Sequence, residues 1–119
     1  MIGAGAGGLA AAAVLSRQGL TVTLFSRSPH RLEPVAARGG VEITGDRGEG
    51  FVPLAGVTQD VAAASEADLL FVFTTANAHG DIARLFAPHI RPEQAVVLAS
   101  GSAGSLEVAK VWRDGGMDP

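Results

Sequence analysis

The sequence predicts an α/β domain with a doubly wound, mostly parallel sheet, and three features support this. Segments typical of strands and of helices alternate along the chain, which indicates crossover units. Two strand-like segments, Leu69–Phe73 and Ala95–Ala99, are apolar at every position, as in parallel strands covered on both faces. The chain has 119 residues, of which 47% are hydrophobic and 18% charged. This length and composition fit one folded domain with a single hydrophobic core.

The first half of the chain predicts two helices, each closed by glycine. The first covers Gly8–Gln18 and ends before Gly19, a residue suited to the left-handed conformation beyond a helix end. The second begins at Ser28-Pro29, where serine caps the helix and proline takes its first position, and it ends at Gly39-Gly40. The expected inner face of the second helix comprises Leu32, Val35 and Ala36.

Strand-like runs accompany these helices at Thr21–Phe25, Val41–Thr44 and Phe51–Leu54. The last two flank a glycine-rich connection, Gly45–Gly50, and predict a β-hairpin inserted into the parallel fold. Further along, Asp60 is expected to cap a short helix reaching about Ala67. Two more helices are expected, from about Gly80 to Ala87 and from the end of the loop Ser100–Gly104 to about Arg113.

Charge and residue usage exclude several classes of protein. The formal net charge is −3 and the nine Lys and Arg residues are scattered, so nothing predicts nucleic-acid binding. No run approaches the ~20 apolar residues that a membrane span requires. The chain has no cysteine, which fits a reducing cytoplasm. No group of His, Asp and Glu has the spacing of metal ligands, so no metal site is expected.

A glycine motif, G-x-G-x-x-G, stands at the start of the chain as Gly3, Gly5 and Gly8. Gly3 permits a tight strand-to-helix turn, Gly5 lets the backbone approach a pyrophosphate, and Gly8 allows close helix packing. Free N–H groups and the positive end of the helix dipole favour phosphates there. The motif therefore predicts a Rossmann-type dinucleotide-binding fold, with a flexible Gly/Ala terminus as the alternative. The predicted cofactor-binding turn comprises Gly3, Ala4, Gly5, Ala6, Gly7 and Gly8.

The end of the second strand bears on the choice of cofactor. An acidic residue there would accept hydrogen bonds from the ribose 2′-OH of NAD and repel a 2′-phosphate. This chain instead has Ser26, Arg27 and Ser28, and the cation of Arg27 can pair with a 2′-phosphate, with Arg31 as a further candidate. NADP is therefore favoured over NAD. The alternative reading is that Arg27 is a solvated surface residue and Ser28 only a helix cap.

Two further loops follow strands and are expected at the same edge of the sheet, where ligands bind in open parallel sheets. The first contributes Thr74, Thr75, Ala76 and Asn77 as candidate cofactor contacts, and the second contributes Ser100. Asn77 is at least as well explained as a helix N-cap. His79 is the one candidate proton carrier, although a single His in a first helical turn is more often a surface residue. His30 and His89, beside prolines, are expected to be solvated.

The chain resembles a known family in three stretches. IGAGAGGLAAAAVLSRQGLTVTLFSRSPHRLEPV, the hairpin VEITGDRGEGFVPL and the segment AVVLASGSAGSLEVAKV look like the N-terminal domain of the opine (octopine/nopaline) dehydrogenases. They are more distantly similar to ketopantoate reductases and NAD-dependent glycerol-3-phosphate dehydrogenases. The resemblance implies hydride transfer from a nicotinamide cofactor to an imine formed from an amino acid and a 2-oxo acid. It also implies that the cofactor lies over Gly3, Gly5 and Gly8, beside the loop Thr74–His79.

Two departures from the family qualify this expectation. Only Met1 and Ile2 precede the glycine turn, so the central first strand is expected to be truncated, leaving two neighbouring strand edges exposed. The family's C-terminal domain, with the substrate pocket and catalytic His, is expected to be absent. Residues 1–113 are then the cofactor-binding domain and residues 114–119 a tail. The chain alone is expected to lack dehydrogenase turnover.

Other functions remain open at this stage. The chain is also consistent with a nucleotide-binding or redox-sensing module that acts with a catalytic partner chain or as a homo-oligomer. It is equally open to interpretation as a gene fragment without a function of its own. An FAD-linked oxidoreductase would share the glycine turn, although the missing acid after the second strand counts against it.

Overall fold

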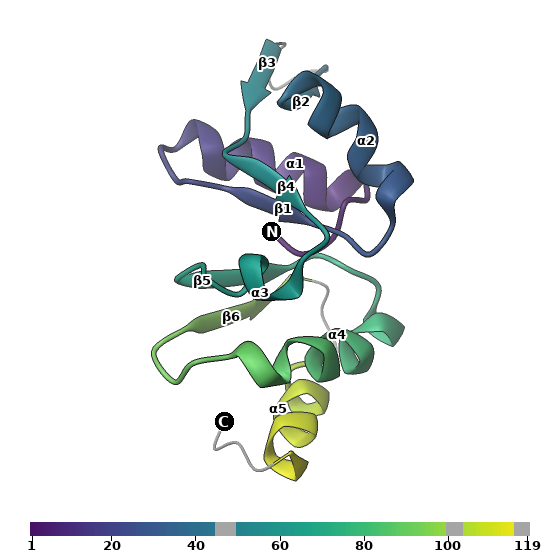
Figure 1. The fold of residues 1–119 in the computed structure, drawn as a ribbon, viewed down its shortest axis with the longest axis vertical. Coiled ribbons are helices and arrows are strands. Elements are labelled where there is room, and N and C mark those ends of the chain that lie inside the picture. Colours follow the sequence, from purple (N-terminus) through teal and green to yellow (C-terminus); the bar gives the residue numbers. More distant parts are fainter. Residues whose placement is uncertain (45–49, 100–103, 116–119) are drawn as a thin grey trace.

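The computed structural model describes residues 1–44, 50–99 and 104–115. In these residues, the central sheet consists of two parallel pairs of strands, and the N-terminal segment lies between them (Figure 1). The pairs are β1 (Thr23–Phe25) with β4 (Gly56–Thr58), and β5 (Leu69–Val72) with β6 (Ala95–Leu98). Ile2 forms parallel bridges to Phe25 and Val72, so the order is β4-β1-Ile2-β5-β6. The predicted parallel sheet is confirmed, and Ile2 lies between its two pairs of strands.

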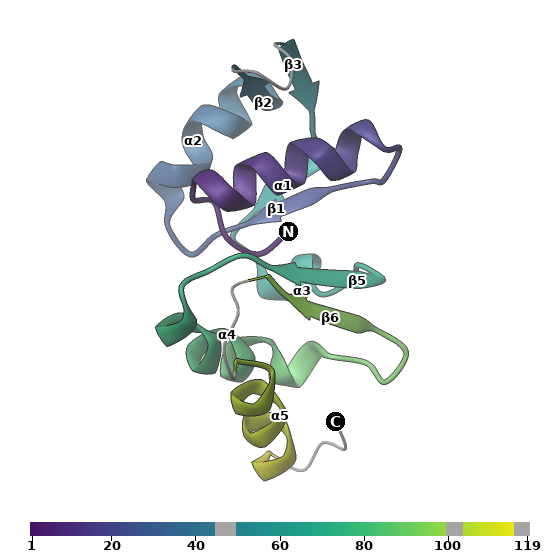
Figure 2. The same cartoon turned by 180° about the vertical axis from the view of Figure 1, so that it is seen from behind.

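Helices cover both faces of this sheet. They are α1 (Ala6–Arg17), α2 (Pro29–Arg38), α3 (Val61–Ala64), α4 (His79–Phe86) and α5 (Gly104–Asp114). Helix α3 lies in front of the sheet in Figure 1, whereas α1 lies in front in the reverse view of Figure 2. The core is divided in the same way. One buried cluster joins Ala64, Ile82 and Phe86 to the sheet, and the other contains Leu32 and Val35 of α2. The sheet is therefore doubly wound.

The inserted β-hairpin is also present. Strands β2 (Gly40–Ile43) and β3 (Gly50–Pro53) pair antiparallel, with Gly40 opposite Pro53. The connection between them, residues 45–49, lies outside the described part of the chain. Gly39 precedes the hairpin with φ +75°, so it is the left-handed cap that the sequence predicts.

Helix boundaries elsewhere follow the expected chemistry. Gly19 has φ +93°, and its N–H donates to the Ser16 carbonyl at 3.1 Å beyond the end of α1. The Asp60 Oδ1 accepts a hydrogen bond of 3.0 Å from the Ala62 N–H, which caps α3. Helix α4 ends at Phe86, and the short 3-10 turn η2 (Ala87–His89) follows it. These ends were predictable because they depend on single residues and their neighbours.

Some sequence predictions are wrong, and each failure has a tertiary cause. Strand β4 was not predicted, because three residues carry little periodic signal and its pairing with β1 is non-local. Strand β6 is not buried on both faces: Ala95 and Val97 are exposed and Val96 and Leu98 are half-buried, because the described elements cover only one face of it. Ala36 of α2 is exposed, unlike its neighbours on the expected inner face.

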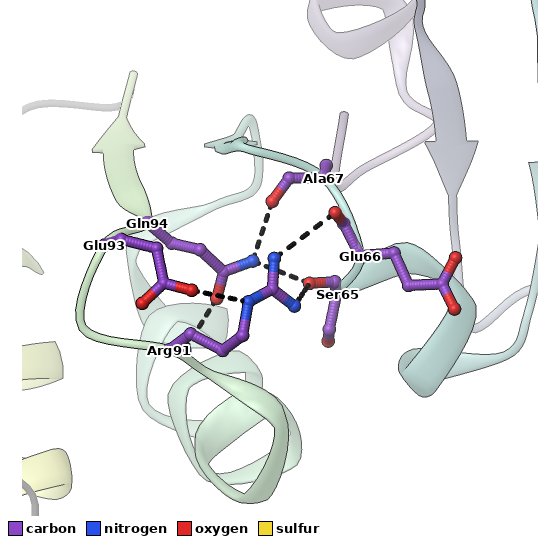
Figure 3. A network of polar contacts seen from close by, with 6 residues as sticks. All are labelled: Ser65, Glu66, Ala67, Arg91, Glu93 and Gln94. Atoms are coloured by element: carbon purple, nitrogen blue, oxygen red, sulfur yellow. Dashed lines mark hydrogen bonds and ion pairs between the residues drawn. The ribbon is translucent and has the colours of Figure 1, made fainter.

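Two loops at the amino ends of β5 and β6 are held together by polar contacts (Figure 3). The side-chain amide of Gln94 donates to the carbonyls of Ser65 and Ala67 at 2.6 and 2.7 Å. The guanidinium of Arg91 donates to the carbonyls of Ser65 and Glu66 at 3.3 and 3.4 Å. These carbonyls follow α3, so the network satisfies backbone groups that the helix leaves without an intrahelical partner. It fixes the segment that leads into β5.

Candidate functional site

A cavity of about 570 Å³ opens at the carboxyl ends of the central strands. It is formed where the glycine turn, the end of β1 and the end of β5 meet, the edge at which open parallel sheets bind ligands. Its lining comprises Ile2, Gly3, Ala4, Gly5, Phe25, Ser26, Arg27, Ser28, Arg31, Phe73, Thr74, Thr75 and Ile82. The cavity thus unites three segments that the sequence had assigned to one site.

The glycine turn is held tightly against the protein. Gly3 has φ +118°, and a Cβ there would stand 2.3 Å from the Phe73 carbonyl oxygen. At Gly8, a Cβ would stand 2.1 Å from the Gly3 carbonyl oxygen, and at Gly7 it would stand 2.2 Å from the Phe73 ring. Real Cβ atoms do not approach this closely, so the fold itself requires glycine at Gly3 and Gly8, where the clash is with backbone, whereas at Gly7 the Phe73 ring would have to move.

Gly5 differs from the other glycines of the turn. The nearest heavy atom to a Cβ at this position would be Nη1 of Arg31, at an ordinary contact distance of 3.7 Å. Its φ of −76° and ψ of 179° are open to any residue. The protein therefore places no steric demand for glycine here. The space beside Gly5 faces the cavity, which leaves room for a ligand to approach the backbone.

The amino end of α1 meets the cavity at the same place. Gly5 is its N-cap, no side chain caps the helix, and its first turn contains no acidic residue. The first N–H groups of a helix have no intrahelical acceptor and carry the positive end of its dipole. Together with the space at Gly5, this end of α1 can accept an anionic group such as a phosphate.

The turn after β1 contributes the charged part of the lining. Ser26 is buried, with an exposed fraction of 8%, and its Oγ accepts a 3.1 Å hydrogen bond from the Ser28 N–H. Ser28 occupies the N-cap position of α2, but its side chain makes no capping hydrogen bond. Arg27 and Arg31 are exposed, line the cavity and take part in no ion pair among the described residues. This side of the cavity therefore carries positive charge without a carboxylate beside it.

The loop after β5 is only partly at the cavity. Thr74 and Thr75 line it, whereas Asn77 lies outside the described lining, in a 3-10 turn, η1 (Ala76–Ala78). Asn77 is exposed, and the N-cap position of α4 belongs to Ala78, so the alternative reading of Asn77 as an N-cap is wrong. Ser100 lies outside the described residues.

His79 is fully buried, with no exposed surface, which corrects the expectation of a surface position. It begins α4 but does not line the cavity. Helix α5 packs on this turn of α4, since a Cβ at Gly80 would meet the Glu107 carboxylate at 2.5 Å. His30 and His89 are exposed, as expected.

Several lining residues were not predicted from the sequence. The apolar part of the lining includes Ile2, Phe25, Phe73 and Ile82. Phe73 is the last residue of the apolar run before Thr74, and its position next to a predicted ligand loop was the available signal. Ile82 and Phe25 reach the cavity from core positions, which the sequence does not distinguish from other buried residues.

Metal and membrane sites receive no support in the described part of the chain. No group of three or more His, Asp or Glu residues there is arranged to hold a metal ion. Over residues 1–44, 50–99 and 104–115, no helix combines the length and apolar character needed to cross a bilayer.

Comparison with known proteins now identifies the family. Residues 1–112 match the model of the family described as Ketopantoate reductase PanE/ApbA. The chain belongs to this family. It carries the N-terminal domain of these NAD(P)-dependent oxidoreductases, so a nicotinamide cofactor and a Rossmann-type fold follow for the family.

Three relatives show the range of the resemblance. An opine dehydrogenase from Arthrobacter sp. (strain 1C) is 30% identical over 98% of this chain, and a glycerol-3-phosphate dehydrogenase [NAD(P)+] from Bradyrhizobium diazoefficiens is 36% identical over 85%. The crystal structure of a proposed ketopantoate reductase from Ralstonia solanacearum MolK2 superposes with a TM-score of 0.64 at 31% identity over 82% of this chain. The chain spans only 33%, 31% and 29% of these proteins. The suspected family is thereby confirmed.

Proposed function

We propose that this chain binds NADP in the cavity at the carboxyl ends of β1 and β5 and serves as the cofactor half of an opine-dehydrogenase-type reductase. The observation that carries the proposal is the composition of the lining. It combines the open backbone at Gly5 with two arginines, and no acidic residue lines it within the described part of the chain. A dinucleotide with a 2′-phosphate needs backbone donors for the pyrophosphate and cations for the extra phosphate.

The residues of the cavity fit the parts of such a cofactor. Gly3, Ala4 and Gly5, with the first N–H groups of α1 from Ala6 to Gly8, would hold the pyrophosphate. Ser26, Arg27 and Ser28 would surround the adenosine ribose, because the turn after β1 presents two hydroxyl groups and a guanidinium to the cavity. Thr74 and Thr75 would lie beside the nicotinamide ribose, and Ala76, Asn77 and Ser100 stay predicted contacts. When bound, the nicotinamide ring supplies the hydride.

The substrate and the proton donor are a separate part of the proposal. The opine-type reaction, hydride transfer to an imine or a 2-oxo acid, is supported by the opine dehydrogenase relative that matches 98% of this chain. Such a reduction also needs an acid to protonate the product. Arg27 and Arg31 are the ionisable side chains of the lining, and arginine does not release its proton near neutral pH. We therefore propose that residues 1–119 alone bind cofactor without turnover.

A second candidate function is a nucleotide-binding module that acts with a catalytic partner chain or as a homo-oligomer. The exposed β6 residues Ala95 and Val97 favour it, since they offer an apolar strand edge and face to a partner. Pull-down or a concentration-dependent change in size would distinguish this role. The lack of cysteine supports a cytoplasmic location as part of the proposal.

Cofactor titration tests the proposed function. We expect NADPH to bind the purified chain about tenfold more tightly than NADH, since one charge-assisted contact contributes about 1.5–3 kcal/mol. The Arg27→Ala variant should lose this preference by weakening NADPH binding while leaving NADH binding unchanged. Arg38→Ala is the matched control, because Arg38 is the last residue of α2, the helix that follows Arg27, and pairs with Glu42 outside the cavity. Equal affinity for both cofactors, or an equal loss in both variants, would contradict the 2′-phosphate role.

A further inference from the structure

Two arginines line the cofactor cavity, and the proposed function gives a ligand group to only one of them. Arg27 is proposed to pair with the 2′-phosphate, whereas Arg31 lines the same cavity from the first turn of α2. The first turns of α1 and α2 lie side by side in both views of the fold (Figure 1 and Figure 2). The Arg31 side chain therefore starts on one helix close to the amino end of the other.

The guanidinium of Arg31 lies beside Gly5, the N-cap of α1. Its Nη1 stands 3.7 Å from the position that a Cβ at Gly5 would take. Among the described residues, no atom of Arg27 lies within 4 Å of that position. Arg31 thus reaches the open space at the glycine turn, while Arg27 borders the cavity from the turn after β1.

Backbone hydrogen bonds fix the place from which the Arg31 side chain starts. The Arg31 N–H donates to the Ser28 carbonyl at 3.2 Å, and the Ser28 N–H donates to the Oγ of the buried Ser26 at 3.1 Å. The next residue, Leu32, is buried in the core and anchors the first turn of α2. Because the base of the side chain is already ordered, a ligand that binds the guanidinium incurs a smaller ordering cost.

The charges around this guanidinium favour an anion. Helix α1 contains no acidic residue, and the first turn of α2 has none either. Within the described part of the chain, Arg31 forms no ion pair, and Glu33 of α2 does not line the cavity. The positive ends of two helix dipoles and a cation therefore meet at one corner of the cavity. An anion bound between them would replace repulsion with attraction.

We propose that Arg31 binds the pyrophosphate of the cofactor, while Arg27 binds the 2′-phosphate. This inference rests on the proposed function, and it divides the two cations between a group that NAD and NADP share and a group that only NADP has. Arg31 borders the space at Gly5 where a ligand can approach the backbone. A guanidinium can donate two parallel hydrogen bonds to phosphate oxygens. Arg31 then contributes affinity for both cofactors, and Arg27 contributes the preference for NADP.

The test measures four ligands on the purified full chain: NADPH, NADH, ADP and adenosine 2′-monophosphate. ADP carries the pyrophosphate without a 2′-phosphate, and adenosine 2′-monophosphate carries the 2′-phosphate without a pyrophosphate. We expect Arg31→Ala to weaken binding of NADPH, NADH and ADP by similar factors, each at least about tenfold, and to leave adenosine 2′-monophosphate unchanged. Arg27→Ala should weaken only NADPH and adenosine 2′-monophosphate. Arg38→Ala, at the other end of α2, is the matched control and should change none of the four.

A second measurement separates a ligand contact from a structural role of Arg31. Without ligand, the Arg31→Ala chain should melt at the same temperature as the unchanged chain or higher, because the substitution removes a cation from the positive end of a helix. Arg31→Lys keeps the charge but cannot donate the parallel pair of hydrogen bonds. It should therefore recover part of the ADP affinity that Arg31→Ala loses.

Three results would overturn the inference. A loss of NADPH and adenosine 2′-monophosphate alone in Arg31→Ala would assign this residue to the 2′-phosphate, the role that the sequence suggested. A loss of all four ligands would mean that Arg31 contacts the adenosine, and a lower melting temperature would mean that it supports the fold.

The proposed function can fail separately. A chain that binds ADP without preferring NADPH to NADH would contradict the role of Arg27, yet the ADP affinity of Arg31→Ala would still decide the role of Arg31. A folded chain that binds none of the four ligands would overturn both proposals.

Discussion

The two ends of the central sheet share one short segment of chain and are built very differently. At the carboxyl end, Ile2 and Gly3 pair with both neighbouring strands, and the glycine turn closes tightly against Phe73. At the amino end, residues of β1, β5, α1 and α3 line a second cavity, of about 480 Å³. Backbone hydrogen bonds thus hold the glycine turn in place at one end of the sheet, whereas a cavity lies between the same two strands at the other end.

The glycine turn repeats this contrast on a smaller scale. Gly3 is required by the fold, since its φ is +118° and a Cβ would clash with the Phe73 carbonyl. Gly5 is not, since the space beside it is open. The fold therefore requires glycine at position 3 and not at position 5. Substitution of these two glycines should separate the stability of the turn from the proposed ligand binding.

Substitution of Gly3 should have the largest effect on stability. In the Gly3→Ala variant, the positive φ and the 2.3 Å approach to the Phe73 carbonyl oxygen both disfavour the new Cβ. Together they should lower the free energy of unfolding by about 3 kcal/mol. The control is Gly56→Ala in β4, where a Cβ would meet no atom within 4 Å. Urea denaturation of the two variants measures the difference, and equal stability would contradict the tight packing of the turn.

Burial of the Met1 amine predicts a pH dependence of stability. The pKa of the Met1 amine is about 6 in the folded chain and 8.0 as the reference value, so the unfolded chain binds more protons between these pH values. The free energy of unfolding should therefore rise from pH 6 to pH 8, by at most about 2.7 kcal/mol. This gain in the free energy of unfolding should be fully present above pH 8 and lost as the pH falls toward 6.

Acetylation of the amine provides the control for this pH dependence. The acetylated chain keeps Glu66 and Asp68, which line the second cavity beside Met1, together with the three histidines. The difference between the two chains, measured by urea denaturation at pH 6 and pH 8, isolates the amine. Parallel pH profiles would show that the amine is solvated rather than buried.

Gly5 should behave in the opposite way to Gly3. Gly5→Ala places a methyl group in open space, so the free energy of unfolding should fall by at most about 1 kcal/mol, the cost of alanine at an N-cap. If a pyrophosphate approaches the backbone at this point, NADPH affinity should fall at least tenfold. Fluorescence titration of the variant beside the unchanged chain tests this, and unchanged affinity would remove Gly5 from the proposed site.

The sequence predicted those features that depend on neighbouring residues. Helix ends at Gly19 and Gly39, the Asp60 cap and the β2–β3 hairpin all follow from local chemistry, and the structure confirms them. The meeting of the glycine turn with Arg27 and Thr74 followed from the rule that parallel strands end at one edge.

The features that the sequence did not predict depend on distant contacts. Strand β4 exists because its backbone pairs with β1, although its three residues carry no distinctive pattern. His79 is polar and begins a helix, yet α5 packs on that turn and it is fully buried. Val97 is apolar and yet exposed, since burial requires another element on that face of β6.

The most direct test of the central claim is to map NADPH binding residue by residue by amide chemical shifts in NMR. We predict that the amides of Gly3–Gly5, Ser26–Ser28 and Thr74–Thr75 shift on addition of NADPH. Amides at the second cavity, at the amino end of the sheet, including Val22 and Leu70, should not shift. This result would place the cofactor at the carboxyl end of the sheet. Shifts confined to the amino end, or no shifts in the folded chain, would contradict the proposed function.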